Sequence, residues 1–373
     1  MKRILVIAAV VGAAFMTACG NQSPIQKGSL SGDMDTLSYA FGVNVAEGFE
    51  MGMKDIPMDW KKVEQTMVET ALDKTSLEHK ASLEKLQAFF GQTLMERRQA
   101  VAKKRAEADS VRLAEGDTTK VEWPVADPEI FASEEERAEI SQALGNDLGK
   151  QLVQMKLPVQ LVWLVQAMQE TREGNGKLTS VQARERIQNY FMVELPAKNL
   201  EASEAWLKQM ASKRGAQTTE SGIVYKIVKA GDEAVKATSP EDVVKVHYTG
   251  RLRTGEVFDS SIFENLPEAV QEQRKMYMGE DAAKSEPAEI PLNRVIPGWT
   301  EGMQLVGKGG KILLWIPAKL AYGERGAGGM IGPNEALEFE VELIDVNPQE
   351  QPAEEVEADA EAAEEAPAEE VAE

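Results

Sequence analysis

Cysteine and histidine are almost absent from this sequence, since its 373 residues include one Cys and two His. A single Cys cannot form an intrachain disulfide or a multi-cysteine zinc site, and two His provide few ligands for a metal centre. Basic residues are also in the minority, 41 Lys and Arg against 62 Asp and Glu, and no basic stripe offsets the formal charge of −21. Because phosphate backbones repel such a chain, we expect neither a metal nor a nucleic-acid partner.

Long hydrophobic runs and nucleotide-binding motifs are missing too. Two Gly-rich segments, Gly307–Gly310 and Gly326–Gly329, lack the Lys-Ser/Thr ending of a phosphate-binding loop, so no cofactor is expected. Hydrophobic residues make up 43% of the chain and charged residues 28%, which is typical of a soluble globular protein. The length favours two or three domains.

The first 18 residues have the features of an export signal. A basic start, Met1–Arg3, precedes a short apolar run from Ile4 to Phe15. This run is too short to cross a hydrocarbon layer of about 30 Å. Met16–Cys19 resembles the lipobox of bacterial lipoproteins, in which cleavage before the Cys leaves Cys19 as an acylated N-terminus. The alternative is an ordinary secretory signal with an incidental Cys.

Acylation at Cys19 would attach the protein to a lipid bilayer. No Asp follows this Cys in Gly20–Ser23, so the lipoprotein resemblance favours the outer membrane, with the body in the periplasm. Residues 19–32 are polar and contain Gly, Ser and Pro, which predicts a flexible tether.

An internal repeat occupies the region after this tether. Ser38–Gly42 recurs as Ser141–Gly145, and Met67–Thr70 recurs as Met168–Thr171, each with apolar residues at helical spacing. We interpret this as two copies of one helical unit. The predicted boundaries are 33–116 for the first copy, 117–132 for a linker, and 133–215 for the second copy with a connecting helix. In that connecting part, Pro196 is expected to break the chain before a helix from about Leu200 to Ser212.

The last third changes to alternating apolar residues, for example Val244, Val246 and Tyr248, which predicts a sheet within residues 216–348. Residues 349–373 contain eleven Asp and Glu and no Lys or Arg, so this tail is expected to be disordered. It carries about half of the net negative charge, and a solubilising role is the simplest interpretation.

Five motifs in the sheet region resemble, in order, those of the FKBP-type peptidyl-prolyl cis-trans isomerases. They are Val246–Gly250, Gly255–Ser260, Val295–Gly302, Ala321–Gly323 and Leu337–Leu343. The resemblance implies a bent antiparallel sheet wrapped around a short helix at about Pro297 to Leu305. The fold class is therefore α+β, with two tandem all-α units followed by this sheet. The helical part resembles the N-terminal region of the macrophage-infectivity-potentiator branch, which dimerises there.

The resemblance also implies the site residues. They are Tyr248, Phe258, Asp259, Val295, Ile296, Trp299, Tyr322, Ile331 and Phe339. In this scheme Trp299 is the floor beneath the proline ring and aromatic and aliphatic side chains form the walls. The Ile296 amide and the Tyr322 hydroxyl donate to the substrate, while Asp259 accepts from Tyr248. The two His are given no catalytic role: His247 is expected to be structural and His79 solvated.

Three departures from the family pattern are visible. Ala327 replaces a His that is common in the flap of eukaryotic members, and Ile290 replaces the usual Phe. A segment from Phe263 to Glu286 is inserted where short members have a brief bulge. Its part from Pro267 to Met278 can form an amphipathic helix. Either a client-binding lip or a long surface loop fits this pattern.

The sequence supports an isomerase that accelerates rotation of X-Pro bonds in proline-containing exported polypeptides, with possible chaperone activity of the helical region. One alternative is a periplasmic binding lipoprotein that holds unfolded chains with weak or no isomerase activity. Another is a surface lipoprotein that adheres to a host or envelope ligand. Because two helical units lie in one chain, we expect a monomer in which they pair, with a homodimer as the alternative.

Overall fold

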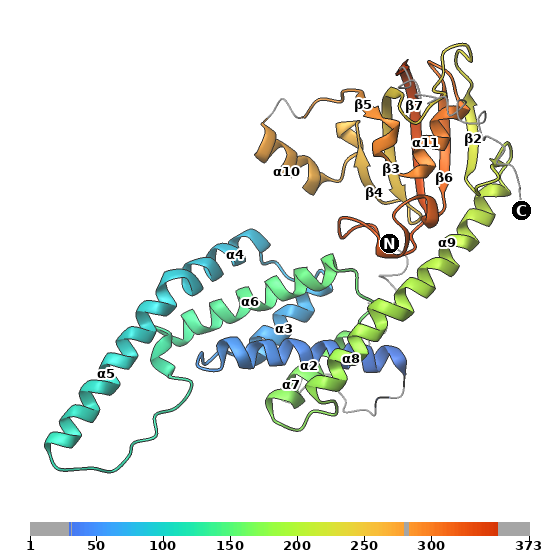
Figure 1. The fold of residues 1–373 in the computed structure, drawn as a ribbon. Helices are drawn as coiled ribbons and strands as arrows, with labels where there is room; N and C mark the ends of the chain where they lie inside the picture. Colours follow the sequence, from blue (N-terminus) through green and yellow to red (C-terminus); the bar gives the residue numbers. More distant parts are fainter. Residues whose placement is uncertain (1–29, 31, 280–282, 350–373) are drawn as a thin grey trace, which may run out of the picture. The chain divides into compact units, whose positions relative to one another are not determined.

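The computed structural model describes residues 30, 32–279 and 283–349. The predicted export signal, Cys19 and the acidic tail beyond residue 349 lie outside these residues. The chain divides into two compact units between Phe191 and Met192. Figure 1 shows helices in the first unit and a sheet in the second.

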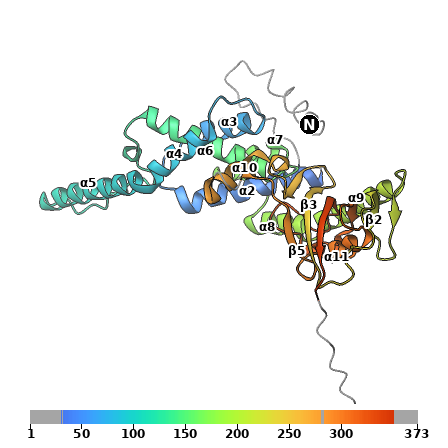
Figure 2. The ribbon, with the colours of Figure 1, turned by 90° about the horizontal axis from the view of Figure 1, so that it is seen from above.

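The repeat corresponds to two equal sets of helices in the first unit. The first set is α2 (Asp33–Met53), α3 (Trp60–Ala71), α4 (His79–Ala88) and a π-helical turn (Phe89–Thr93). The second is α6 (Glu134–Gln154), α7 (Leu161–Arg172), α8 (Ser180–Asn189) and a π-helical turn (Tyr190–Glu194). Corresponding helices begin 101 positions apart. A further helix, α5 (Leu94–Ala114), projects beyond the others (Figures 1 and 2).

The two sets exchange their first helices. α2 packs against α7 and α8, whereas α6 packs against α3 and α4. Two equivalent hydrogen bonds between the sets show the same exchange. The Gln160 amide, at the start of α7, donates to Ser38 Oγ at 2.9 Å, and the Asp59 amide, at the start of α3, donates to Ser141 Oγ at 3.0 Å. Neither set is therefore an independent domain, because each one supplies the packing partner of the other's first helix.

Glycine at the end of each repeat motif permits this packing. A Cβ on Gly42 would lie 2.1 Å from the Leu164 carbonyl oxygen, and one on Gly145 would lie 2.4 Å from the Val63 carbonyl oxygen. These distances are shorter than any carbon–oxygen contact tolerates, so both helix crossings require a residue without a side chain. The crossings are equivalent because Val63 and Leu164 are themselves repeat counterparts.

Two local interpretations of the helical sequence are wrong. His79 is not freely solvated, since its Nε2 lies 2.9 Å from Asp147 Oδ1 and its side chain is 28% exposed. Pro196 does not break the chain either. It is the second residue of α9 (Leu195–Ala211), which follows the π-helical turn Tyr190–Glu194 directly, so the chain stays helical through this proline.

The second unit begins with α9 and continues into an antiparallel sheet, as the predicted α+β fold requires. Its strands are β1 (Gln217–Thr218), β2 (Val224–Lys229), β3 (Val243–Leu252), β4 (Val257–Ser260), β5 (Ala288–Pro291), β6 (Lys311–Ile316) and β7 (Leu337–Asn347). In the described part of the unit their order is β1-β2-β6-β7-β3-β4, and β5 also pairs with β3.

β4 and β5 pair with different parts of β3. β4 pairs with Thr249–Arg251, and β5 pairs with Val243–Val246. The inserted segment leaves the sheet between these two strands and contains the 3₁₀ turn Phe263–Asn265 and helix α10 (Glu268–Met278). The insertion thus starts directly after the Phe258-Asp259 pair of the candidate site.

A short helix, α11 (Pro297–Gly302), lies on the sheet and is followed by a 3₁₀ turn, Met303–Leu305. A Cβ on Gly298 would lie 2.3 Å from a methyl of Ile316, and one on Gly302 would lie 2.5 Å from a methyl of Leu314. Glycine at these two positions, one turn apart, therefore lets α11 rest directly on β6. This close packing fixes the position of Trp299 between them in the sequence.

Candidate active site

Four aromatic side chains from three strands and α11 form one perpendicular cluster. The Trp299 ring is centred 5.3 Å from the Tyr248 ring and 5.4 Å from the Phe339 ring, at interplanar angles of 89° and 90°. Phe258 in turn lies 5.6 Å from Phe339 at 89°. Edge-to-face contacts of this kind are attractive and orient each ring. Trp299 is 4% exposed, so it is held as the base of the cluster.

The absence of a side chain at Gly250 leaves space on the sheet for two of these rings. In the register of the sheet Gly250 lies between Asp259 of β4 and Phe339 of β7. A Cβ on Gly250 would lie 2.7 Å from the Phe258 ring and 2.9 Å from the Phe339 ring. The glycine of the Thr249-Gly250 motif therefore makes room for the two aromatic walls, a role that the sequence did not reveal.

Tyr248 and Asp259 form the polar side of the cluster. The Tyr248 hydroxyl donates to Asp259 Oδ2 at 2.6 Å, and the Asp259 carboxylate also accepts from the Ser260 amide at 2.9 Å. Burial raises the pKa of the Tyr248 hydroxyl well above its usual value, and the hydrogen bond to Asp259 raises it further. The hydroxyl is therefore a donor that stays protonated at neutral pH.

The remaining predicted residues surround the same cluster. Val295 and Ile296 pack against the core that contains Trp299 and Phe339, and Ile331 is 8% exposed in that core. Tyr322 is 40% exposed. Its pKa is raised, first by burial and then by the negative charge of Asp259. All nine predicted side chains thus belong to one region of the second unit.

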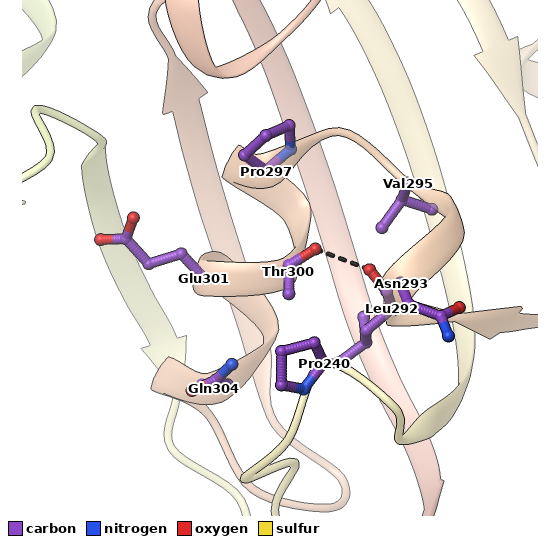
Figure 3. A pocket seen from close by; sticks show the side chains of 8 residues that line it. All are labelled: Pro240, Leu292, Asn293, Val295, Pro297, Thr300, Glu301 and Gln304. Carbon is purple, nitrogen blue, oxygen red and sulfur yellow. Dashed lines mark hydrogen bonds between the residues drawn. The ribbon is translucent and has the colours of Figure 1, made fainter.

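The loop that carries Val295 and Ile296 is tied to α11. Thr300 Oγ1 donates to the Leu292 carbonyl at 2.6 Å, as Figure 3 shows. Around this bond lies a hollow lined by Pro240, Leu292, Asn293, Val295, Pro297, Thr300, Glu301 and Gln304. It is separate from the aromatic cluster, because none of Tyr248, Phe258, Trp299 or Phe339 lines it.

Three further observations concern the charged and metal-binding residue types. Among the described residues, no group of three or more His, Cys, Asp or Glu side chains is placed to hold a metal ion. His247 is occupied structurally, with Nδ1 3.2 Å from Ser261 Oγ. Arg274 of α10 was not among the predicted site residues, but its guanidinium lies 3.5 Å from Asp259 Oδ1. The two residues are fifteen positions apart in the sequence, so no local spacing pattern could have indicated this contact.

Comparison with known proteins relates both parts of the chain to one family. Residues 235–344 match the family model of the FKBP-type peptidyl-prolyl cis-trans isomerase, and residues 137–227 match that of the domain amino terminal to FKBP-type peptidyl-prolyl isomerase. The second match includes most of α6 and all of α7 to α9, whereas the first helical copy lies before it.

Individual relatives give the same result. A probable FKBP-type peptidyl-prolyl cis-trans isomerase FkpA of Neisseria meningitidis is 40% identical, over 57% of this chain and 76% of the relative. The outer membrane protein MIP of Legionella longbeachae is 34% identical, over 57% of this chain and 86% of the relative. The crystal structure of FkpA from Escherichia coli aligns at 30% identity over 58% of this chain and 99% of that one, with a TM-score of 0.40. The two family-model matches and the sequence identities of the Neisseria and Legionella relatives show that the chain belongs to the family of FKBP-type peptidyl-prolyl cis-trans isomerases.

Proposed function

We propose that this protein accelerates the cis-trans rotation of X-Pro bonds in exported polypeptides, with the aromatic cluster as its active site. The observation that carries the proposal is the burial of Trp299 between perpendicular Tyr248 and Phe339 rings, which offers a proline ring a dry, flat floor. Family membership supports the same activity.

The physical chemistry of the amide explains why such a site suffices. Rotation costs about 18–20 kcal/mol because the twisted bond loses its resonance, and proline makes both end states accessible. Water solvates the planar amide dipole better than the twisted one, so it opposes the transition state. A site that excludes water and fits the twisted form therefore binds the transition state more tightly than the substrate, and no bond is broken.

The polar groups have a positioning role in this scheme. The hydroxyl of the partly exposed Tyr322 donates to a substrate carbonyl, and the Ile296 amide donates to a second carbonyl. Asp259 orients Tyr248 through their 2.6 Å hydrogen bond and faces the rotating carbonyl. Phe258, Val295, Ile331 and Phe339 complete the apolar walls.

Substitutions at the floor and at the donor test this assignment. We expect Trp299→Leu to lower kcat/KM on an Ala-Leu-Pro-Phe peptide by about tenfold or more, since each 1.36 kcal/mol of lost transition-state binding is a factor of ten. Tyr322→Phe is expected to cost less. Exchange NMR measures the rotation directly, and far-UV circular dichroism checks that each variant is folded. Equal activity of wild type and Trp299→Leu would reject the assignment.

We further propose that Cys19 anchors the protein by its acyl chains to the outer membrane, with the body in the periplasm. The lipobox resemblance supports this, and one relative is named as an outer membrane protein. Wild type should therefore appear in the membrane fraction and Cys19→Ala in the soluble periplasmic fraction. Equal membrane association of both would contradict the anchor.

A monomer is the third part of the proposal. The exchange of α2 and α6 between the two copies satisfies within one chain the contacts that a pair of chains would otherwise share. Light scattering should give the mass of one mature chain at micromolar concentration. Twice that mass would overturn this part and leave the isomerase assignment untouched.

A chaperone activity of the helical unit is a second candidate. Apolar side chains are exposed at the equivalent C-terminal ends of α2 and α6, namely Met51 at 85% and Val153 at 50%. Such side chains can contact unfolded chains. Suppression of client aggregation by the full-length Trp299→Leu variant, at wild-type level, would favour it, whereas complete loss of suppression would exclude it.

A further inference from the structure

The inserted segment is a built structure attached to the sheet. Phe263 and Leu266 are buried, at 6% and 4% exposure, and anchor its beginning. The Asn265 side-chain amide donates to Thr249 Oγ1 of β3 at 2.9 Å. The Phe263 amide donates to Ser285 Oγ, near the end of the segment, at 2.8 Å. The base of the insert is therefore closed and fixed beside β3.

Helix α10 is held on this base by three side chains. Gln271 Nε2 donates to the Leu266 carbonyl at 2.8 Å, and the Lys275 ammonium lies 5.6 Å from the centre of the Phe263 ring. Arg274 reaches the candidate active site, with its guanidinium 3.5 Å from Asp259 Oδ1. Both members of this ion pair are partly exposed, at 36% and 45%, so the pair adds little to stability. The ion pair instead determines where α10 lies, which is at the edge of the candidate active site.

The C-terminal turn of α10 exposes three large apolar residues in succession. Met276, Tyr277 and Met278 are 77%, 76% and 71% exposed. Positions i+3 and i+4 of a helix lie on the same side as position i, so Tyr277 and Met278 continue the side of Arg274. Met276, at i+2, points away from that side. Two apolar side chains therefore extend the active-site edge by one helical turn beyond Asp259.

We propose that α10 is a recognition lip, in which Tyr277 and Met278 contact apolar residues of the polypeptide that flank the X-Pro bond in the site. This inference rests on the proposed isomerase function. The occupant follows from continuity with the site, because α10 reaches Asp259 through Arg274 and so lies beside a polypeptide whose proline occupies Trp299. Methionine and tyrosine suit a variable partner, since Met adapts its shape and Tyr gives a large amphipathic surface.

Charge argues against a membrane as the occupant. α10 contains two acidic residues, Glu268 and Glu272, and two basic ones, Arg274 and Lys275. A helix that binds anionic lipid headgroups carries an excess of Lys and Arg on its polar face. The balanced charge and the direct contact with Asp259 favour the peptide.

Two peptides separate the lip from the catalytic floor. One is the tetrapeptide Ala-Leu-Pro-Phe, which has only two residues before its proline and one after it and so offers no long flanks to Tyr277 and Met278. The other is a 16-residue peptide with the same four residues at its centre and Leu and Phe in both flanks. Isomerisation of each is measured by exchange NMR with the full-length protein, for wild type and for Tyr277→Gln/Met278→Gln. Gln is polar and keeps the helix propensity of the replaced Met.

We expect the double variant to act on the tetrapeptide within twofold of wild type and to lose about fivefold in kcat/KM on the long peptide, because two apolar contacts are removed. Met276→Gln is the matched control, with equal exposure on the other side of the same helix, and should leave both peptides unchanged. Val111→Gln/Leu113→Gln in α5 controls for a general loss of exposed apolar surface, as these residues are 59% and 56% exposed.

Three outcomes would contradict the proposal that α10 is a recognition lip. They are unchanged activity on the long peptide, an equal loss on both peptides, and an equal loss for Met276→Gln. Impaired binding to phosphatidylglycerol vesicles with unchanged long-peptide activity would assign α10 to a membrane instead. If wild type fails to isomerise even the tetrapeptide, the proposed function falls. In that case, fluorescence anisotropy of the labelled long peptide tests the recognition lip independently of catalysis. Weaker binding by the double variant supports the lip, and equal binding rejects it.

Discussion

Arg172 of the second helical copy lies with its guanidinium against the Glu64 carboxylate of the first copy, and the two side chains are only 15% and 6% exposed. Gln169 Nε2 also donates to Glu64, at 2.6 Å, and the guanidinium lies 5.0 Å from the centre of the Trp60 ring. The repeat counterparts are unlike, since Val165 corresponds to Glu64 and Ala71 to Arg172. A pair of two first copies would bury the Glu64 carboxylate without an arginine. A pair of two second copies would bury the Arg172 guanidinium without a carboxylate. The ion pair therefore favours pairing of unlike copies, as one chain provides.

Replacing each partner by its repeat counterpart tests this coupling. Arg172→Ala should lower the free energy of unfolding of the helical unit by about 3–5 kcal/mol, because it leaves the buried Glu64 charge unpaired. Glu64→Val/Arg172→Ala should recover most of that loss, since an apolar pair avoids the desolvation of two charges. Urea unfolding followed by circular dichroism measures both.

The exposed ion pair between Arg98 and Asp55 serves as the control. Its side chains are 43% and 35% exposed, so Arg98→Ala should cost no more than about 1 kcal/mol. A double variant that is as unstable as Arg172→Ala would show that the loss comes from packing around Arg172, and the argument for charge coupling would fail.

The helix crossing at Gly42 gives a second prediction. Gly42→Ala should destabilise the helical unit by several kcal/mol, on the order of a severe core substitution, because its Cβ would overlap the Leu164 carbonyl and the Ala167 methyl. Gly48 lies on the same helix with nothing within 4 Å of an added Cβ. Gly48→Ala should therefore stabilise by about 0.5–1 kcal/mol through helix propensity alone. Thermal unfolding of both variants measures the contrast, and a loss of equal size at both positions would contradict the crossing.

The equivalence of the helical copies was visible in the sequence, but their exchange was not. Ser38 and Ser141 stand at the same place in the repeat, which indicates two similar units. Ser38 accepts a hydrogen bond from the start of a helix in the other copy, more than 100 residues away. A periodic pattern in the sequence carries no information on contacts between residues so far apart. The prediction at Pro196 was wrong for a local reason, because proline usually ends or kinks a helix, whereas here it follows a π-helical turn and the helix continues.

The aromatic cluster was more predictable than its surroundings. Family motifs fix Tyr248, Phe258, Trp299 and Phe339, and the alternation of β3 and β7 directs Tyr248 and Phe339 to one face of the sheet. Arg274 lies outside every motif. Its contact with Asp259 depends on the path of the inserted segment, which the resemblance does not cover.

Asp242 gives a prediction of stability against pH. Its side chain is 1% exposed and accepts the backbone amides of Thr238, Ser239 and Gln349 at 2.8, 3.0 and 3.0 Å. Burial alone would raise the pKa of this carboxyl, but the three amide donors outweigh burial and hold the pKa below its usual value. The stabilisation is therefore complete above about pH 4, the unfolded value, and is lost as the pH falls through the lower folded value.

We expect Asp242→Asn to lower the free energy of unfolding of the sheet unit by about 2–3 kcal/mol at pH 7, since an amide cannot accept all three bonds. The difference from wild type should shrink at pH 3 and below. Urea unfolding at several pH values, with the exposed Glu233→Gln as control, measures it. A difference that is independent of pH would show that shape rather than charge matters at this position.

The pH dependence of catalysis follows from the two tyrosines. Burial raises the pKa of both Tyr248 and Tyr322, and the nearby Asp259 charge raises them further, above the usual value of about 10. Both hydroxyls therefore remain protonated donors throughout the range from pH 7 to 9. Since amide rotation needs no acid or base, we expect kcat/KM on Ala-Leu-Pro-Phe to vary by less than about twofold across that range. Measurements at constant ionic strength, with Tyr322→Phe as the control, test this. If wild type loses activity with a midpoint below pH 9 and Tyr322→Phe does not, the Tyr322 hydroxyl ionises in that range and its role as a protonated donor is refuted.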